Sequence, residues 1–187
     1  MTLEGYPKHI VLKDGTKVTL RPMVKDDLVK LQEFFAGISE YDRHHLRDDV
    51  GNPEVIKEWV DTLDYERVLP ILAEVDDLVV ADATLHRRKC GLTKHAAKVR
   101  IVVGPDYRRK GLGTWMMLDL VNLAMSLGTE KVIAEFAAEL ETPAIKAAER
   151  LGFYRTAMIA DYYKDMDGKE YDLVMMVKTF YPDWGDY

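Results

Sequence analysis

The chain has 187 residues, of which 48% are hydrophobic and 31% are charged, and its formal net charge is −6 at pH 7. A chain of this length and composition buries a full hydrophobic core as one globular domain without disulfides. The single cysteine, Cys90, excludes an internal disulfide framework, and the acidic balance argues against a general nucleic-acid binder. We expect one domain over residues 1–187, with its core at about 10–180 and a C-terminal tail at 181–187.

The N-terminal residues M-T-L-E-G-Y-P-K-H contain no apolar run of the kind found in a signal peptide. No stretch of the chain reaches the ~20 apolar residues that a membrane-spanning helix needs. Together with the single cysteine, which fits a reducing compartment, this pattern predicts a cytoplasmic protein that acts without a membrane.

Hydrophobic periodicity and turn residues predict alternating strands and helices. The first element is a hairpin at 10–20, where two alternating runs flank Asp14-Gly15. Further strands are expected at 68–75, 78–86, 98–103, 131–138, 153–159 and 171–178, and helices at 25–36, 52–62, 111–127 and 142–151. Residues 38–51 show no periodicity and are expected to be irregular.

A basic loop that contains glycine separates the expected strand at 98–103 from the expected helix at 111–127. Its residues are Arg108-Arg109-Lys110-Gly111-Leu112-Gly113-Thr114. Glycines at the start of a helix leave the backbone N–H groups of the first turn free to close on a ligand, and the helix dipole adds partial positive charge there. With three cations beside them, these N–H groups predict a diphosphate site.

Two better-known phosphate loops are excluded by their spacing. A Walker loop requires G-x-x-x-x-G-K-[ST], which does not occur, and a dinucleotide fingerprint that starts at Gly111 would need glycine where the chain has Met116. The motif that does occur is R-x-x-G-x-G, directly after a strand and before a helix. It resembles the acyl-CoA pyrophosphate loop of the GNAT family, the GCN5-related N-acetyltransferases.

Two further stretches resemble the same family. Residues 144–153, A-I-K-A-A-E-R-L-G-F, are similar to its second signature, and residues 12–47 are similar to the acetyltransferase domain of bacterial protein-lysine acetyltransferases. The order of the expected strands and helices is also that of a GNAT domain. The resemblance therefore implies an α+β fold, with a mixed, mostly antiparallel central sheet flanked by helices and the cofactor loop where two central strands diverge.

The resemblance implies acetyl-CoA as the acyl donor, without a metal, and it carries over a set of cofactor-binding positions. These are Ile101, Val102, Val103, Arg108, Arg109, Lys110, Gly111, Leu112, Gly113, Thr114, Glu141 and Ala144. Glu141 stands where the family often has an asparagine that contacts the pantetheine arm.

Two proton-transfer positions of the family carry other residues in this chain. Lys98 occupies the position of the glutamate that commonly serves as general base, and Ala148 occupies that of a tyrosine that can protonate the leaving thiolate. Backbone N–H groups of the strand at 99–103 would still be able to polarise the thioester carbonyl. We therefore expect intact cofactor binding, with acid–base chemistry supplied by other side chains.

Two carboxylates on strands beside the expected cleft, Asp82 and Glu135, are the candidate bases. Asp82 ranks first because antiparallel pairing of its strand with the cofactor strand would place it across from residues near Val103. For either residue a solvent-facing strand position is the commoner setting, and a slip of one residue would turn Asp82 to the other face. The tyrosines available as replacement acids are Tyr154, Tyr162 and Tyr163.

A strongly basic segment runs from Arg87 to Lys110, with nine lysine or arginine residues and a single acid, Asp106. Since it leads into the expected diphosphate loop, we interpret the charge as electrostatic steering of the phosphates of coenzyme A. A nucleic-acid partner is disfavoured because no aromatic residues interleave with these cations.

The function favoured by these features is transfer of acetyl from acetyl-CoA to a primary amine, and the resemblance favours a protein lysine as the acceptor. A small amine or polyamine is the alternative acceptor. An acyl-CoA-binding or sensing module with little catalysis is the alternative function, because Lys98 and Ala148 replace the usual base and acid. The sequence leaves the oligomeric state and the preferred acyl group open.

Overall fold

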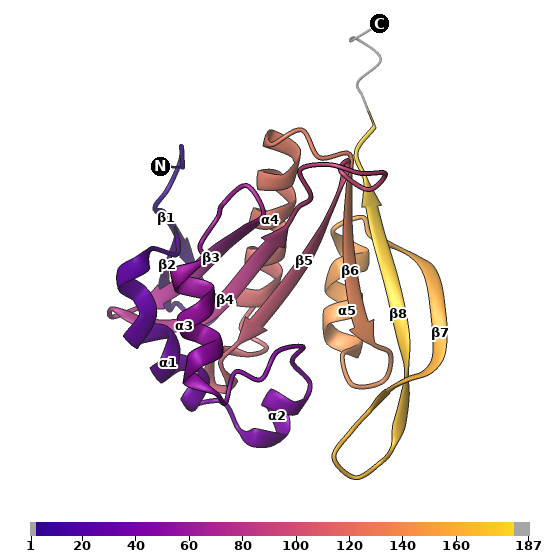
Figure 1. Ribbon diagram of the computed structural model, residues 1–187, viewed down its shortest axis with the longest axis horizontal. Helices are drawn as coiled ribbons and strands as arrows, with labels where there is room; N and C mark the ends of the chain where they lie inside the picture. Colours follow the sequence, from indigo (N-terminus) through magenta and orange to yellow (C-terminus); the bar gives the residue numbers. More distant parts are fainter. Residues whose placement is uncertain (1–2, 182–187) are drawn as a thin grey trace, which may run out of the picture.

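The computed structural model describes residues 3–181, which form one sheet with helices on both faces (Figure 1). The strands are β1 (Lys8–Val11), β2 (Lys17–Pro22), β3 (Val68–Val75), β4 (Leu78–His86), β5 (Ala96–Val103), β6 (Lys131–Ala137), β7 (Tyr154–Lys164) and β8 (Glu170–Thr179). The helices are α1 (Leu28–Ala36), α2 (Glu40–His44), α3 (Pro53–Asp61), α4 (Leu112–Ser126) and α5 (Thr142–Arg150), with short 3-10 turns η1 (Lys25–Asp27) and η2 (Pro105–Tyr107).

The eight strands lie in the order β1-β2-β3-β4-β5-β6-β8-β7. Every neighbouring pair is antiparallel except β5 with β6, which is parallel. The expected α+β class, with a mixed and mostly antiparallel sheet, is confirmed.

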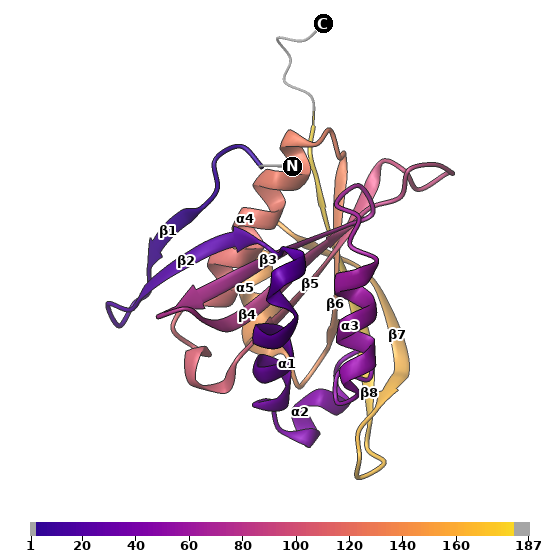
Figure 2. The same cartoon turned by 60° about the vertical axis from the view of Figure 1, so that its left-hand side comes forward.

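Helices cover the two faces of the sheet unequally. Helices α4 and α5 lie on one face, and α1 and α3 cover only the β2–β4 half of the other (Figures 1 and 2). Each face therefore has its own hydrophobic cluster, the larger one under α4 and α5. On the α1 side, neither α1 nor α3 lies over β5 and β6, and this is where a cleft can form.

Helix α4 is buried on most sides, as its nearly continuous apolar sequence predicts. Its one buried acid, Asp119, accepts hydrogen bonds from the Tyr6 hydroxyl and, at 2.6 Å, from the Lys8 Nζ. These bonds attach the N-terminal segment to α4, and strand β1 already begins at Lys8. Residues before 10 are thus joined to the core by these contacts.

Three local expectations differ from the structure. The segment 38–51 contains helix α2, capped by the Ser39 hydroxyl, which accepts the Asp42 backbone N–H. The expected helix at 25–36 is divided into η1 and α1. Strand β7 continues to Lys164, beyond the expected end at 159, because it is an edge strand exposed on nearly every residue and so lacks an apolar alternation that could mark its length.

A buried ionic cluster joins β2 and β3 to the start of α1. The Arg21 guanidinium donates to the buried Asp27 Oδ1 at 2.6 Å and to the Glu74 Oε1 at 2.6 Å. Lys30 Nζ approaches the same Glu74 oxygen at 2.9 Å. Since both carboxylates depend on Arg21, the cluster fixes the entry of the first helix against the sheet.

We expect Arg21→Gln to lower the free energy of unfolding by about 2–4 kcal/mol, because it leaves the buried Asp27 carboxylate without its main partner. Urea unfolding followed by circular dichroism measures this change. The control is Lys57→Gln on α3, which breaks an exposed pair with Asp61 and should change stability by less than about 0.5 kcal/mol. Equal losses in the two variants would contradict the role given to the cluster.

Candidate cofactor and acceptor site

Strands β5 and β6 part soon after they begin. Their parallel pairing is limited to the three pairs Ala96–Lys131, Ala97–Val132 and Lys98–Ile133. Beyond Lys98, β5 pairs only with β4, and β6 pairs only with β8. Figure 1 shows the two ribbons diverging from this point. The edge of β5 that faces β6 is therefore unpaired over 99–103, and N–H and C=O groups along it are available to a ligand.

The chain that follows β5 forms the glycine-containing loop for which the sequence predicts a diphosphate site. Gly104 donates its N–H to the Val80 carbonyl at 2.9 Å, and a Cβ there would lie only 3.0 Å from that oxygen. Gly111, at the N-cap of α4, has φ +94°, in the left-handed region that favours glycine. These two glycines let the loop turn tightly between the strand and the helix.

The first turn of α4 presents its backbone N–H groups to this loop. No side chain caps the helix, and the Leu112, Gly113 and Thr114 N–H groups have no acceptor within residues 3–181. Free N–H groups and the helix dipole suit an anion of the size of a diphosphate. The residues present thus fit the diphosphate of an acyl-CoA.

Two of the loop cations make contacts within the described chain. Arg108 donates from Nε to the Val103 carbonyl at 3.0 Å and from Nη1 to Asp42 Oδ1 of α2 at 3.1 Å. Lys110 Nζ lies 2.9 Å from Asp14 Oδ2 in the β1–β2 turn. A diphosphate would have to compete with Asp42 for Arg108. Electrostatic steering by the wider basic segment stays a prediction.

The open half of the α1 face has a polar floor. The β4–β5 register pairs Asp82 with Val102, Thr84 with Arg100 and His86 with Lys98, so these side chains share one face of the sheet. Asp82 thus lies across from the cofactor strand, one residue from Val103. From the sequence, the alternation along each strand was the one indication of which β4 and β5 side chains would share a face.

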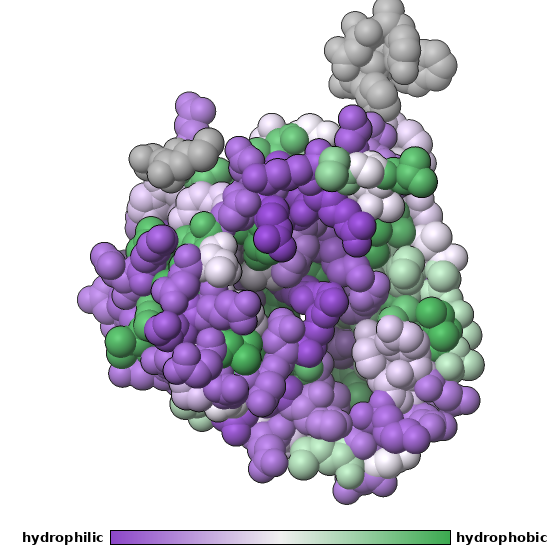
Figure 3. Space-filling model, viewed as in Figure 1, coloured by the Kyte–Doolittle hydropathy of each residue, from purple (hydrophilic) through white to green (hydrophobic). Residues whose placement is uncertain are grey.

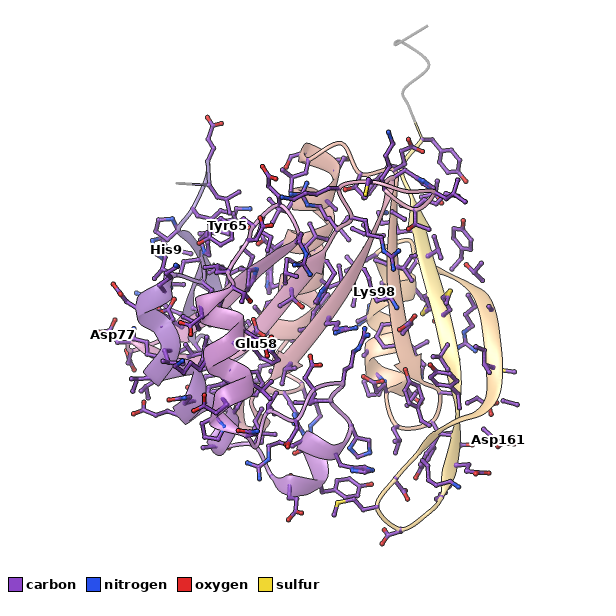
Figure 4. The ribbon with its side chains drawn as sticks, viewed as in Figure 1. His9, Glu58, Tyr65, Asp77, Lys98 and Asp161 are labelled. Atoms are coloured by element: carbon purple, nitrogen blue, oxygen red, sulfur yellow. The ribbon has the colours of Figure 1, made fainter. Side chains whose placement is uncertain are left out.

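Lys98 forms an ion pair across the parting strands. Its Nζ lies 2.6 Å from Glu135 Oε1 of β6, and Figure 4 labels Lys98 between the two strands. The carboxylate of Glu135 is therefore within hydrogen-bond distance of the side chain that replaces the usual glutamate base. Sequence spacing could not have paired these two residues, because they are 37 positions apart and on different strands.

Asp82 is a nearly isolated carboxyl group. It is 8% exposed, and its Oδ1 is buried without a hydrogen-bond partner within the described chain. Burial raises the pKa of Asp82 to about 7. A carboxyl group that titrates near neutral pH is suited to general-base chemistry.

Of the three candidate tyrosines, only Tyr163 is half-buried; Tyr154 and Tyr162 are exposed. Burial and the neighbouring carboxylates of Glu135 and Glu141 raise the pKa of Tyr163 to about 12. The phenol therefore keeps its proton at neutral pH, close to the parting strands. At the position where the family has its tyrosine, helix α5 carries Ala148, whose side chain is fully buried in the core.

Glu141 precedes α5 as its N-cap residue, and its carboxylate accepts the Ala137 backbone N–H at 2.7 Å. This contact holds the turn between β6 and α5 beside the opening. Ala144 follows in the first turn of α5 and is partly exposed. Both positions follow the end of β6 that has parted from β5, and the resemblance implies that Glu141 lies near the pantetheine arm.

Helix α2 and the loop after it lie over the cleft. The His44 Nε2 is 3.2 Å from the Lys164 carbonyl at the end of β7, so α2 reaches across to the β7–β8 hairpin. A hollow of about 440 Å³ lies beside it, lined by residues of 40–51 and by Met166. Figure 3 shows hydrophilic residues around the hollowed centre of this face. We interpret this side as the acceptor entrance.

The part of the chain that the structure describes contains no group of three or more His, Cys, Asp or Glu side chains able to hold a metal ion. Within the same residues, no helix is long and apolar enough to cross a membrane.

Comparison with known proteins adds a family and a set of similar folds. Residues 30–153 match the model of the acetyltransferase (GNAT) family. Ribosomal protein bS18-alanine N-acetyltransferases of Escherichia coli K12 and Shigella flexneri are 32% identical over 80 residues, which cover 43% of this chain and 53% of theirs. The chain therefore spans about half the length of the curated relatives it matches.

Solved structures of GNAT acetyltransferases share the fold. The GNAT domain of S. lividans PAT has a TM-score of 0.77 and 16% identity, covering 96% of this chain and all of that one. The structure of yncA from Salmonella typhimurium with its cofactor acetyl-CoA has a TM-score of 0.74 and 18% identity, covering 89% and 96% of the two chains. At these identities the likeness concerns the fold alone.

We expect Gly113→Asp to reduce the affinity for coenzyme A by at least about 100-fold, or ~2.7 kcal/mol, because it places a negative charge at the N-terminus of α4. The fold should survive, since a Cβ at this position would lie 3.5 Å from Val103 Cγ2, an ordinary contact. Titration calorimetry measures the affinity, and thermal unfolding checks the fold.

The control is Gly113→Ala, which adds the Cβ without the charge and should lose less than about tenfold in affinity. Unchanged affinity in a folded Gly113→Asp protein would show that the diphosphate does not bind at this helix end.

Proposed function

The chain belongs to the acetyltransferase (GNAT) family, whose members use acetyl-CoA, and we propose that it transfers the acetyl group to a primary amine, with a protein lysine as the favoured acceptor. The observation that carries the proposal is the buried carboxyl group of Asp82, opposite Val102 of the cofactor strand and with one oxygen free of partners. A protein acceptor is supported by the hollow beside α2, which lies on the face of the sheet opposite α4 and α5 (Figure 1).

Acetyl-CoA, when bound, supplies the acetyl group as an activated thioester. The unpaired edge of β5 beyond Lys98 would hold the pantetheine arm and direct backbone N–H groups at the thioester oxygen. These contacts would need no side chain, so they would persist although the usual base and acid are replaced. The first turn of α4 would hold the diphosphate.

The attacking amine must be neutral, and an amine with a pKa near 10 is mostly protonated at pH 7. In this proposal the carboxylate of Asp82 takes the proton from the amine, directly or through one water molecule. The amine nitrogen bonds to the carbonyl carbon, and the carbon–sulfur bond breaks to release the thiolate. Tyr163 donates a hydrogen bond to that sulfur from its neutral hydroxyl group.

Glu135 is the rival base. Its side chain is 25% exposed, but one carboxylate oxygen already lies 2.6 Å from Lys98 Nζ, whereas Asp82 Oδ1 has no hydrogen-bond partner within the described chain. We assign the Lys98–Glu135 pair a structural role at the apex of the cleft, the point where β5 and β6 part. Asp82 is assigned the role of proton acceptor.

An acyl-CoA-binding module without catalysis is the second candidate. It is favoured by one observation, the complete burial of Ala148 where a phenol would be needed. The two functions separate in one experiment, in which acetyl-CoA binding is measured by calorimetry and thiol release is followed with a panel of lysine peptides and small amines. Binding without thiol release over the whole panel would contradict the acetyltransferase proposal.

We expect Asp82→Asn to lower kcat/KM for amine acetylation at least about tenfold at pH 7. Because Asp82 must be ionised to act and its pKa is about 7, wild-type kcat/KM should rise with pH through about 7. The variant should lose this step and recover part of its activity at alkaline pH, where more of the amine is neutral.

The pH–rate profile is measured in parallel for Glu135→Gln, which should retain the step near pH 7. If the step were lost in Glu135→Gln and kept in Asp82→Asn, the two assignments would be reversed. If both variants kept the wild-type profile, neither carboxylate would be the base.

We expect Tyr163→Phe to lower kcat about tenfold with little change in KM, because its hydroxyl group would act only on the departing sulfur. The matched control is Tyr162→Phe, which removes the hydroxyl of the adjacent tyrosine, 58% exposed, and should leave kcat unchanged. Steady-state kinetics with a saturating acceptor measure both. A kcat unaffected in Tyr163→Phe would remove this residue from the mechanism.

A further inference from the structure

Arg100 is a half-buried cation in the floor of the cleft. Arg100 is paired with Thr84 of β4, so the Arg100 side chain lies on the same face of the sheet as Asp82 and His86. The guanidinium has no hydrogen bond or ion pair with any residue between 3 and 181. A partly desolvated guanidinium without a partner is costly, so a bound ligand is the natural source of its missing acceptor.

In the part of the chain that the structure describes, none of the carboxylates near Arg100 forms an ion pair with it. Lys98 is paired with Glu135, and the remaining charged neighbours above the floor are Arg47 and Asp48 of the loop after α2. Burial, together with the nearby Arg47 guanidinium, lowers the pKa of Arg100. Burial and the Arg100 guanidinium also lower the pKa of His86 to about 4, so this imidazole is neutral at pH 7.

The phosphates of the donor cannot be the missing partner. Arg100 lies four residues before Gly104, which is about 13 Å along a strand, and the diphosphate loop begins only there. The pantetheine arm that would pass Arg100 carries no charge. The anion must therefore come from the acceptor side, where Arg47 borders the hollow beside α2.

We propose that Arg100, with Arg47 above it, binds a carboxylate that the acceptor carries on the same residue as its reacting amine or on the adjacent residue. This inference rests on the proposed function, because it assumes that the amine enters from the α2 side. A planar guanidinium binds a carboxylate through two parallel hydrogen bonds, so the contact would also orient the amine. The acceptor class is a lysine with an acidic neighbour, or an amino acid with a free carboxylate.

An ammonium group next to the reacting amine would face Arg100, and like charges in a partly desolvated site repel each other. The hollow outside it carries both signs of charge, because Glu40, Asp48 and Asp49 line it together with Arg43 and Arg47. An uncharged acceptor would leave Arg100 without a partner. The charge of the acceptor next to its amine is thus the property that the site selects.

The test uses two matched sets of acceptors. One is a lysine peptide in which the residue after lysine is Glu, Gln or Lys, and the other is N-α-acetyl-lysine against its carboxamide. We expect wild-type kcat/KM to be at least about tenfold higher for the carboxylate-bearing member of at least one set. In Arg100→Gln the preference should fall below about twofold, and Arg47→Gln should reduce it without abolishing it.

The control is Arg88→Gln, which removes one positive charge from an exposed residue of the loop after β4 and should leave the preference unchanged. A preference in the peptide set alone shows that Arg100 recognises an acidic residue beside the lysine. A preference in the N-α-acetyl-lysine set alone shows that it recognises the free carboxylate of an amino-acid-like acceptor. The inference is overturned if the wild type shows no preference in either set, or if Arg100→Gln lowers kcat equally for every acceptor and keeps the preference.

Failure of the proposed function is distinguishable from failure of this inference. If no amine is acetylated, the proposed function fails, and fluorescence anisotropy of labelled peptides with coenzyme A present then tests the carboxylate site alone. Tighter binding of the Glu peptide than of the Gln peptide by the wild type, lost in Arg100→Gln, would support the site. Equal binding of both peptides would overturn it.

Discussion

The separation of β5 from β6 is the constraint on which the site depends. Three parallel pairs hold the two strands together, after which β4 and β8 keep them apart as their respective partners. A free strand edge in the middle of a sheet must be satisfied by a ligand or by water. Since the loop after β5 turns directly into α4, the same divergence that frees the edge also brings the helix N-terminus to its open end.

The ionic chemistry of the cleft is distributed over several strands. The candidate base is on β4, the proposed carboxylate-binding arginine is on β5, and the apex carboxylate is on β6. The apex of the cleft is an example. Lys98 stands where the family usually has its base, and its carboxylate partner, Glu135, comes from the neighbouring strand. The charge balance where β5 and β6 part therefore depends on side chains of two strands.

Helix α2 contacts both the loop before α4 and the end of β7. One of its residues, Asp42, binds Arg108 of the diphosphate loop, and another, His44, contacts the end of β7. The loop that follows it carries Arg47 above the floor of the cleft. A helix of only five residues therefore depends on its neighbours for its position and links the two ends of the site.

The sequence by itself determined the elements whose signals are local. Alternation around Asp14-Gly15, the apolar run of α4 and the spacing of Gly111 and Gly113 predicted the hairpin, the buried helix and the diphosphate loop, because each depends on neighbours within a few residues. Helix α2 was within reach as well, since Ser39 and Asp42 have capping-box spacing.

Only the tertiary structure decided which side chains meet in the cleft. The pairing of Lys98 with Glu135, the burial of Asp82 and the choice of Tyr163 over Tyr162 all depend on strand order and register. A register shift of one residue would turn each of these side chains to the opposite face without changing the local pattern. Burial and charge at the site arise from contacts between strands distant in the sequence, and no local pattern contains them.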